Sequence, residues 1–292
     1  MGYAEEALNH FFKSVEFGQS VEHSVTEIFR LLSNYELDGA DIKISAMLKC
    51  FDANKFDLRN LIQFSIKKLD QDAEFGKAMS LSRSGKPGEA AKVFFLSKSQ
   101  KLLNHPLLLE VLKGGVVQNI ELEKILTEIR MMVLLEDPVK KLEDIKLANF
   151  LAALCQQCIN NEYVYRVSES ERHILEKIES SFAKSPQQDS WEFKLLPMYC
   201  LYHSPIDIEQ KSKLKNLHSN FDHSIVKNVV EPYLKEIALE ETYMSGINRL
   251  TKLNNSSEQV AAQYEENPYP RWQGVAPVHP GDEIVHLIEQ LG

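Results

Sequence analysis

Two cysteines, Cys155 and Cys158, form the sequence CQQC, which has the spacing of half a zinc site or of a redox pair. A zinc site needs two further ligands at a matching spacing, and Cys50 and Cys200 each stand alone. A redox pair would follow a strand and lie at a helix N-terminus, whereas this pair lies within an apolar helical pattern. We therefore predict that both cysteines are buried core residues and that the chain holds no metal site.

The nine histidines are scattered along the chain, and only one cluster could do chemistry. His218 and Asp222 are four positions apart, which places them on one face of a helix, and His223 follows directly. A single pair does not make a metal site, so the pattern favours a solvated polar face.

No catalytic motif is complete in the sequence. Gly114-Gly115 follows a helical segment and lacks both a third glycine and a preceding strand, so it is interpreted as a helix terminator and not as a phosphate-binding loop. The patterns G-x-S-x-G, H-E-x-x-H and the P-loop do not occur. We predict no catalytic residues and no nucleotide or adenosyl cofactor bound by this chain on its own.

An aromatic and proline-rich strip occupies residues 263–272, with the sequence QYEENPYPRW. The X-Pro steps before Pro268 and Pro270 restrict the backbone to extended or polyproline geometry, which a helical core cannot use. Such a segment suits a partner surface, although composition equally allows a tail that folds back on its own bundle.

The elements that must position these residues all show helical periodicity, and only 12 Gly and 11 Pro interrupt them. The sequence predicts an all-α protein, an array of antiparallel helix pairs or a helical bundle, followed by an extended Pro-rich segment and a short helix. The expected helices cover residues 3–33 with a break near Gly18, 42–51, 58–69, 73–84, 89–97, 107–112, 120–135, 146–165, 169–183, 191–203, 211–217, 225–239, 255–266 and 282–291.

The most specific helix pair covers residues 73–99. Its two helices flank the turn Gly85-Lys86-Pro87-Gly88, and small residues would let them approach closely: Gly76, Ala78, Ala90 and Ala91. The pair resembles a tetratricopeptide unit, but no regular 34-residue period extends along the chain. Farther on, Ser168 with Glu171 forms a predicted capping box for the helix at 169–183.

Four regions follow from this pattern: N-terminal helices at 1–70, a tetratricopeptide-like region at 71–184, a C-terminal helical region at 185–262 and the aromatic, proline-rich end at 263–292. The stretch Ser185-Pro186-Gln187-Gln188-Asp189 is the clearest linker.

Composition narrows the possible partners. A formal net charge of −9 over 292 residues argues against a nucleic-acid or anionic membrane surface. No apolar run is long enough to span a membrane, residues 1–9 lack a signal peptide's regions, and four cysteines in so long a chain make no disulfide framework. The sequence predicts a reduced, cytoplasmic protein.

The strip at 263–272 is closely similar to a segment just upstream of the adenosylmethionine-binding domain in a family of tetratricopeptide-containing class I methyltransferases. Residues 105–130, 150–167 and 229–237 match the helical region of the same proteins, so the similarity spans about residues 73–291. The resemblance implies that Tyr264, Tyr269, Arg271 and Trp272 contact or cover the catalytic domain. It also implies that the Rossmann-type domain, which binds the cofactor adenosylmethionine, would follow residue 292.

The leading hypothesis is therefore a non-catalytic region of a methyltransferase that binds or positions a substrate or partner, with a homodimer as a further option. Two alternatives are a free-standing helical interaction scaffold and a subunit completed by a separately encoded methyltransferase chain. The expected partner is a protein or peptide, and the acidic balance favours a basic patch on it. Neither nucleic acid nor a membrane is expected, and the sequence does not indicate the substrate.

Overall fold

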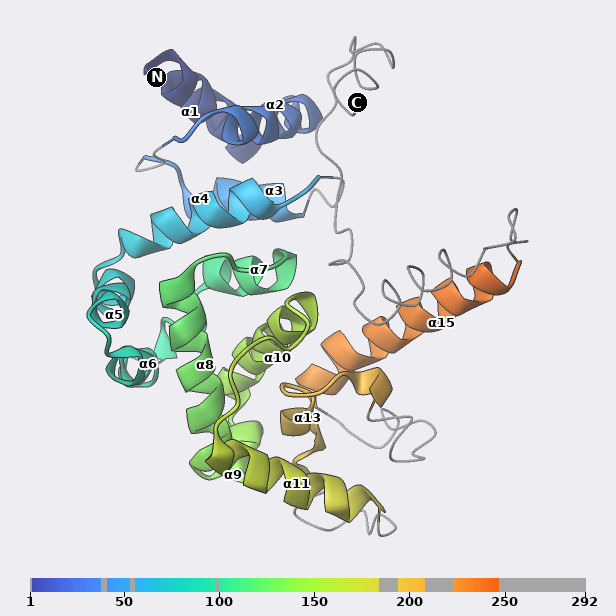
Figure 1. The fold of residues 1–292 in the computed structure, drawn as a ribbon. Coiled ribbons are helices and arrows are strands. Elements are labelled where there is room, and N and C mark those ends of the chain that lie inside the picture. Colours follow the sequence, from blue (N-terminus) through green and yellow to red (C-terminus); the bar gives the residue numbers. More distant parts are fainter. Residues whose placement is uncertain are drawn as a thin grey trace, which may run out of the picture. The chain divides into compact units, whose positions relative to one another are not determined.

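The computed structural model describes residues 2–37, 41–52, 56–97, 100–183, 194–207 and 223–246. Fourteen helical elements occur within these ranges, and no strand does (Figure 1). The predicted all-α class is confirmed. The chain divides into two compact units, with the described residues up to Gln71 in the first and those from Asp72 onward in the second.

Four helices form the described part of the first unit: α1 (Gly2–Glu16), α2 (Val21–Asn34), α3 (Ile44–Phe51) and α4 (Arg59–Asp70). Helix α1 packs against α2 and α3, and α2 packs against α4. The core contains fully buried Leu8 and Ile28, and the rings of Phe12 and Phe64 stack with their centroids 6.0 Å apart. Gly18 has a φ of 71°, and this left-handed residue makes the predicted break between α1 and α2.

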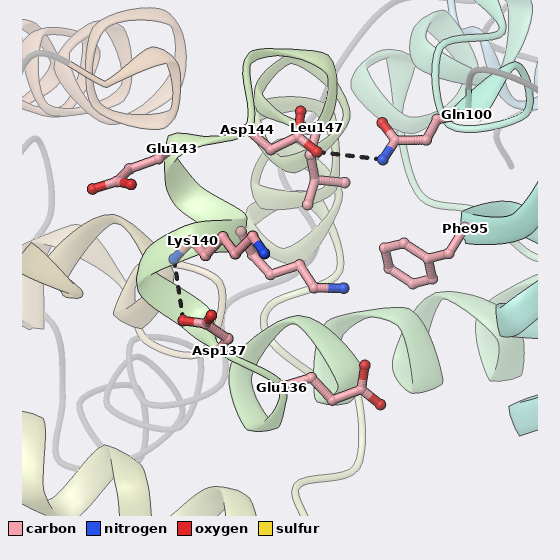
Figure 2. Close-up of a pocket in the computed structure, with 9 residues that line it drawn as sticks. Phe95, Gln100, Glu136, Asp137, Lys140, Glu143, Asp144 and Leu147 are labelled. Atoms are coloured by element: carbon pink, nitrogen blue, oxygen red, sulfur yellow. Dashed lines mark hydrogen bonds between the residues drawn. The ribbon is translucent and has the colours of Figure 1, made fainter.

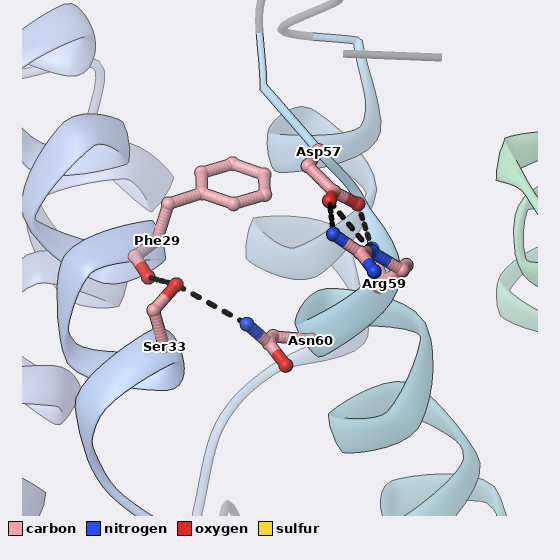
Figure 3. Close-up of polar contacts among 5 residues, drawn as sticks. All are labelled: Phe29, Ser33, Asp57, Arg59 and Asn60. Atoms are coloured by element: carbon pink, nitrogen blue, oxygen red, sulfur yellow. Dashed lines mark hydrogen bonds and ion pairs between the residues drawn. The ribbon is translucent and has the colours of Figure 1, made fainter. Parts of the chain in front are cut away.

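A side-chain hydrogen bond between Asn60 and Ser33 joins α4 to α2 (Figure 3). The Ser33 hydroxyl donates to the Phe29 carbonyl oxygen at 2.8 Å and accepts from the Asn60 amide at 3.1 Å. Asp57 accepts a hydrogen bond from the backbone N–H of Arg59 at 3.0 Å and also binds the Arg59 guanidinium. These contacts fix the start of α4 and its position on α2.

Ten helical elements form the described part of the second unit: α5 (Ala73–Arg83), α6 (Pro87–Leu96), α7 (Pro106–Gly114), α8 (Ile120–Leu135), α9 (Pro138–Glu143), α10 (Ile145–Asn160), α11 (Glu169–Ala183), α13 (Leu196–Tyr199), the π-helix η3 (Val226–Val230) and α15 (Glu231–Gly246). Helix α8 packs against α5, α6, α9 and α11, while α10 packs against α7, α9 and η3. These two helices carry the core of the unit.

The helix pair α5–α6 has the hairpin form that the sequence predicts. The Asp72 side chain caps α5 by accepting from the backbone N–H of Glu74 at 2.9 Å and of Phe75 at 3.1 Å. The predicted small contact residues Ala78, Ala90 and Ala91 are fully buried between the helices and their neighbours. The return helix begins at Pro87, two residues earlier than predicted, because proline fits the first helical position. A tetratricopeptide-like repeat arrangement stays a prediction.

Three helices differ from the sequence-based expectation. The helix predicted at 146–165 ends at Asn160, because Glu162 and Tyr163 take left-handed φ values of 56° and 59°. Helix α9 was not expected. The segment predicted as a helix at 225–239 instead starts with a π-helical turn and continues as α15 to Gly246.

Several predicted segments cannot be compared in full. The helices expected at 211–217, 255–266 and 282–291, the linker at 185–189 and the strip at 263–272 lie outside the described residues. Of the helix expected at 191–203, the structure describes residues 194–203, in which α13 spans Leu196–Tyr199 alone. The prediction is wrong for 200–203, which form turns and a bend. None of the described helices combines the length and hydropathy that a membrane span requires.

Candidate functional site

A cavity of about 650 Å³ opens on the second unit, between the end of α6 and the segment from α8 to α10 (Figure 2). This volume lies in the range of ligand-binding pockets in proteins. The cavity is lined by Phe95, Gln100, Glu136, Asp137, Lys140, Lys141, Glu143, Asp144 and Leu147. Six of these nine side chains are charged, while apolar atoms make up the larger share of the exposed lining.

The short helix α9 and the residues that flank it carry all six charged side chains of the cavity. Helix α8 ends at Leu135, and Asp137 then adopts a left-handed φ of 52° that turns the chain into α9. The Asp137 side chain caps α9 by accepting from the backbone N–H of Lys140 at 3.5 Å, and Pro138 fills the first helical position. As a result, one tight turn presents carboxylates and lysines toward the same cavity.

The Phe95 ring forms the aromatic part of the wall. The ammonium nitrogen of Lys141 lies over this ring, 4.3 Å from its centroid. This is a cation–π contact, in which the positive charge meets the electron-rich face of the ring. Leu147, from the first half of α10, adds a buried apolar side chain to the same wall.

Gln100 lies across the cavity from α9, as Figure 2 shows, and has a left-handed φ of 54°. Its amide nitrogen donates to Asp144 Oδ2 at 3.3 Å. Its Oε1 atom is buried and has no hydrogen-bond donor among the described residues. A buried acceptor without a donor is costly, and solvent does not reach this atom in the free chain.

The charge of the cavity is negative. Its lining contains four carboxylates and two ammonium groups, a formal charge of −2. Within the described part of the chain, the carboxylates of Glu136 and Glu143 have no hydrogen bond or ion pair. These oxygens are available to donors from a bound molecule.

A second polar centre, built on Arg130 of α8, is closed to solvent. The Arg130 side chain is fully buried, and its guanidinium donates to the carbonyl oxygens of Leu201 at 3.2 Å, Tyr165 at 3.3 Å and Arg166 at 3.1 Å. The guanidinium carbon also lies 4.0 Å from the centroid of the Tyr202 ring. Arg130 therefore holds together three chain segments that are distant in sequence.

The predicted capping box is confirmed, and it connects to this centre. The backbone N–H of Ser168 donates to Glu171 Oε2 at 2.6 Å, and the Ser168 hydroxyl accepts from the backbone N–H of Glu171 at 3.3 Å. Glu171 is almost fully buried, and its Oε1 accepts from the Tyr202 hydroxyl at 2.7 Å. Burial raises the pKa of Tyr202 far above its usual value, so the hydroxyl remains a donor.

The prediction that Cys155 and Cys158 are core residues is confirmed, because both thiols are fully buried in α10. All four cysteines of the chain are free. Cys200, which stands alone in the sequence, lies beside this pair: the Cys155 thiol donates to the Cys200 carbonyl oxygen at 3.4 Å.

Burial keeps these thiols protonated. It raises the pKa of Cys158 to about 11 and that of Cys200 to about 12, and it raises the pKa of Cys155 well above its usual value. Thiols in this state are poor nucleophiles and poor metal ligands. Among the described residues, no group of three or more His, Cys, Asp or Glu side chains is arranged to hold a metal ion.

His223 differs from the solvated side chain that the sequence favoured. It is half-buried, and its Nδ1 accepts from the backbone N–H of Ile225 at 3.1 Å while Nε2 lies 3.1 Å from the Leu142 carbonyl oxygen. The imidazole thus braces the start of η3 against α9, and burial lowers its pKa. The other two members of the predicted polar cluster, His218 and Asp222, lie outside the described residues.

The other predicted features have separate outcomes. Gly114 is the last residue of α7 and Gly115 is extended, so the interpretation of this pair as a helix terminator is confirmed. The four residues expected to cover a catalytic domain, Tyr264, Tyr269, Arg271 and Trp272, lie outside the described residues, and their role stays a prediction.

Sequence reasoning missed both the cavity and the Arg130 centre. For Arg130 a signal was present, since it lies four residues after Leu126 and therefore on the apolar stripe of α8. For the cavity, the dipeptide Asp137-Pro138 before two lysines marks a helix start, although it says nothing about the Phe95 ring opposite.

Comparison with known proteins gives no match. No protein-family model, no curated protein and no solved structure matches the chain.

Proposed function

We propose that the chain is a helical binding and positioning region that serves an adenosylmethionine-dependent methyltransferase and does not itself transfer the methyl group. The observation that carries the proposal is the charged cavity at the junction of α6, α8, α9 and α10. A site with acceptors, cations and one aromatic ring in its wall is suited to recognising the polar groups of a partner.

The rigidity of the second unit supports a positioning role. Arg130 fixes α8 to two other segments, at residues 165–166 and at Leu201, and Glu171 with Tyr202 fixes the start of α11 to the same centre. The charged cavity lies at the far end of α8 from its first turn, where α8 leads into α9. A partner held there would be presented on a well-braced helix, and a stable geometry of that kind is what positioning requires.

The link to a methyltransferase is supported by the resemblance of residues 263–272 to the segment that precedes adenosylmethionine-binding domains. Under the proposal, Tyr264, Tyr269, Arg271 and Trp272 contact or cover such a domain, within the same protein or in a separate chain. Two tyrosines and a tryptophan supply large contact area at low entropic cost, as interface residues do.

The first test is calorimetric titration of adenosylmethionine into the 292-residue chain. We expect no binding heat, because the proposal assigns the cofactor to the partner domain. Binding with a micromolar dissociation constant would overturn the proposal.

The second test uses a protein that joins this region to the catalytic domain. Replacing Trp272 by alanine should weaken adenosylmethionine binding or lower turnover, while Trp191→Ala, outside the strip, serves as the matched control. If Trp272→Ala leaves both properties unchanged, the assigned role of the strip is wrong. A chain that associates with no adenosylmethionine-binding domain would instead be a free-standing scaffold.

A further inference from the structure

We propose that the cavity binds an arginine side chain from a basic, extended segment of a partner protein. This inference rests on the proposed function. In the free chain, Lys141 occupies the position that this arginine would take on the Phe95 ring. Three features of the cavity carry the inference: the cation already on the ring, the negative charge of the lining and the acceptor that lacks a donor.

The Lys141 ammonium on the Phe95 ring shows where the positive charge of a ligand fits. The Lys141 ammonium lies 4.3 Å from the centroid of Phe95. This is its one contact of a polar or electrostatic kind among the described residues, and the Lys141 side chain is half-buried on the short helix α9. Lys141 can therefore swing into solvent at little cost and leave the ring face to another cation.

The charge of the lining selects a cation as the guest. Four carboxylates face two lysines, and those of Glu136 and Glu143 have no hydrogen bond or ion pair within the described part of the chain. Once Lys141 has moved out, the negative charge around the ring increases. This negative charge repels an anionic ligand and attracts a cationic one.

The unpaired acceptor distinguishes arginine from lysine. Gln100 Oε1 is closed to solvent in the free chain and has no donor among the described residues, while the Gln100 amide nitrogen is bound to Asp144. A guest donor reaches this oxygen when the Gln100 side chain turns it toward the cavity. A guanidinium is planar and carries five N–H donors, so it can stack on an aromatic ring and donate in its own plane at the same time. An ammonium on the ring, as Lys141 shows, leaves the Gln100 oxygen without a donor from the part of the chain that the structure describes.

The partner is a protein segment because of the size and openness of the site. A volume of about 650 Å³ exceeds what one arginine side chain fills, and it leaves room for the flanking backbone. The net charge of −9 for the whole chain attracts a basic segment from a distance and raises its rate of association.

The test is a fluorescence-anisotropy titration of the full chain with a labelled peptide, acetylated and amidated, that has one arginine flanked by glycine and serine. A matched peptide carries citrulline, which has the shape of arginine but no charge. We expect the arginine peptide to bind at least about tenfold more tightly than the citrulline peptide. Equal binding of the two peptides, or no binding of either at millimolar concentration, would overturn the inference.

Variants locate the binding site. Phe95→Leu keeps the apolar bulk and removes the ring, so the arginine peptide should bind about threefold to tenfold more weakly. Glu136→Gln with Glu143→Gln should weaken it by about tenfold. The control is Glu169→Gln with Glu176→Gln, which makes the same change in net charge on exposed positions of α11 and should leave affinity within about twofold.

Lys141→Met tests the displacement step directly. Removing the resident cation should tighten binding of the arginine peptide by about threefold, since no cation then has to leave the ring. Weaker binding would overturn the proposed displacement. Free arginine that binds as tightly as the peptide would show that no flanking segment is recognised, and it would overturn the assignment of the ligand to a protein.

These results separate the two proposals. If the cavity variants bind the arginine peptide with unchanged affinity, this inference alone is overturned. The chain could still position a partner through another surface. Binding of adenosylmethionine to the chain overturns the proposed function, whatever the peptide does.

Discussion

Two cations in the second unit make the same type of contact in opposite environments. The Arg130 guanidinium lies 4.0 Å from the centroid of Tyr202, and the Lys141 ammonium lies 4.3 Å from the centroid of Phe95. Arg130 is fully buried and donates to three backbone carbonyl oxygens, whereas Lys141 borders an open cavity and is held by the ring alone among the described residues.

Burial decides what each contact does. A buried guanidinium that loses its partners is an uncompensated charge at low dielectric, so Arg130 is fixed in place. An ammonium at the edge of a cavity regains its hydration when it leaves the ring, so Lys141 can be exchanged. The comparison predicts that changes near Arg130 alter stability and that changes near Lys141 alter binding.

The largest expected effect is that of Arg130→Met. Methionine fills much of the volume but donates no hydrogen bond, so the carbonyl oxygens of Leu201, Tyr165 and Arg166 lose their donors. The free energy of unfolding should fall by about 3–5 kcal/mol in a urea titration. A fall below about 1 kcal/mol would show that Arg130 does not brace the unit, and the comparison would fail.

Alkaline pH should destabilise the same region. The ordinary thiol pKa of 9.0 applies to the unfolded chain, while burial raises the pKa of Cys158 to about 11 and that of Cys200 to about 12. Above about pH 9 the unfolded chain therefore releases protons that the folded chain retains, and the free energy of unfolding decreases as pH rises.

Together with Cys155, whose pKa is also raised, these thiols should lower the free energy of unfolding by roughly 4 kcal/mol between about pH 7 and about pH 10. Urea titrations at several pH values measure this loss. In Cys158→Ala the loss should be smaller by about 1 kcal/mol. An unchanged pH dependence in that variant would mean that Cys158 is not the thiol that resists ionisation.

Tyr202→Phe should have an intermediate effect. The substitution keeps the ring under Arg130 but removes the hydroxyl that donates to Glu171 Oε1 at 2.7 Å. Among the described residues, the buried carboxylate then retains only the Ser168 backbone N–H at Oε2, and we expect a loss of about 2 kcal/mol in urea titrations. Tyr163→Phe, which removes a buried hydroxyl that has no hydrogen-bond partner among the described residues, is the matched control. Equal losses in both variants would contradict the assigned role of the Tyr202 hydroxyl.

The parts of the fold that could be predicted are those specified by neighbouring residues. Helix α8 covers residues 120–135 as the apolar stripe indicates, and α11 begins after the capping box of Ser168 and Glu171. Caps and periodicity act within a few residues, so a single sequence records them. Helix α9, with six residues, is too short to show a period.

The parts that could not be predicted depend on contacts between distant residues. Nothing in the sequence marks Glu162 and Tyr163 as left-handed, yet they end α10 at Asn160. Cys200 lies next to Cys155, and Phe95 meets Lys141, only because α10 and α9 fold back on other elements. The candidate site consists of residues that are distant in sequence and meet only in the fold. The sequence contains its charged residues but does not indicate that they lie together.

The smallest expected effect on stability is that of Lys141→Met, and it completes the comparison with Arg130→Met. Exposed cation–π contacts contribute about 0.5–1 kcal/mol, and the apolar methionine side chain recovers part of this by packing on the Phe95 ring. The free energy of unfolding should therefore change by less than about 0.5 kcal/mol. Lys140→Met, on the same helix but without the ring contact, gives the baseline for losing one positive charge from α9. If Lys141→Met instead cost more than about 2 kcal/mol beyond that baseline, Lys141 would be a structural residue like Arg130, and the cavity would have no exchangeable cation.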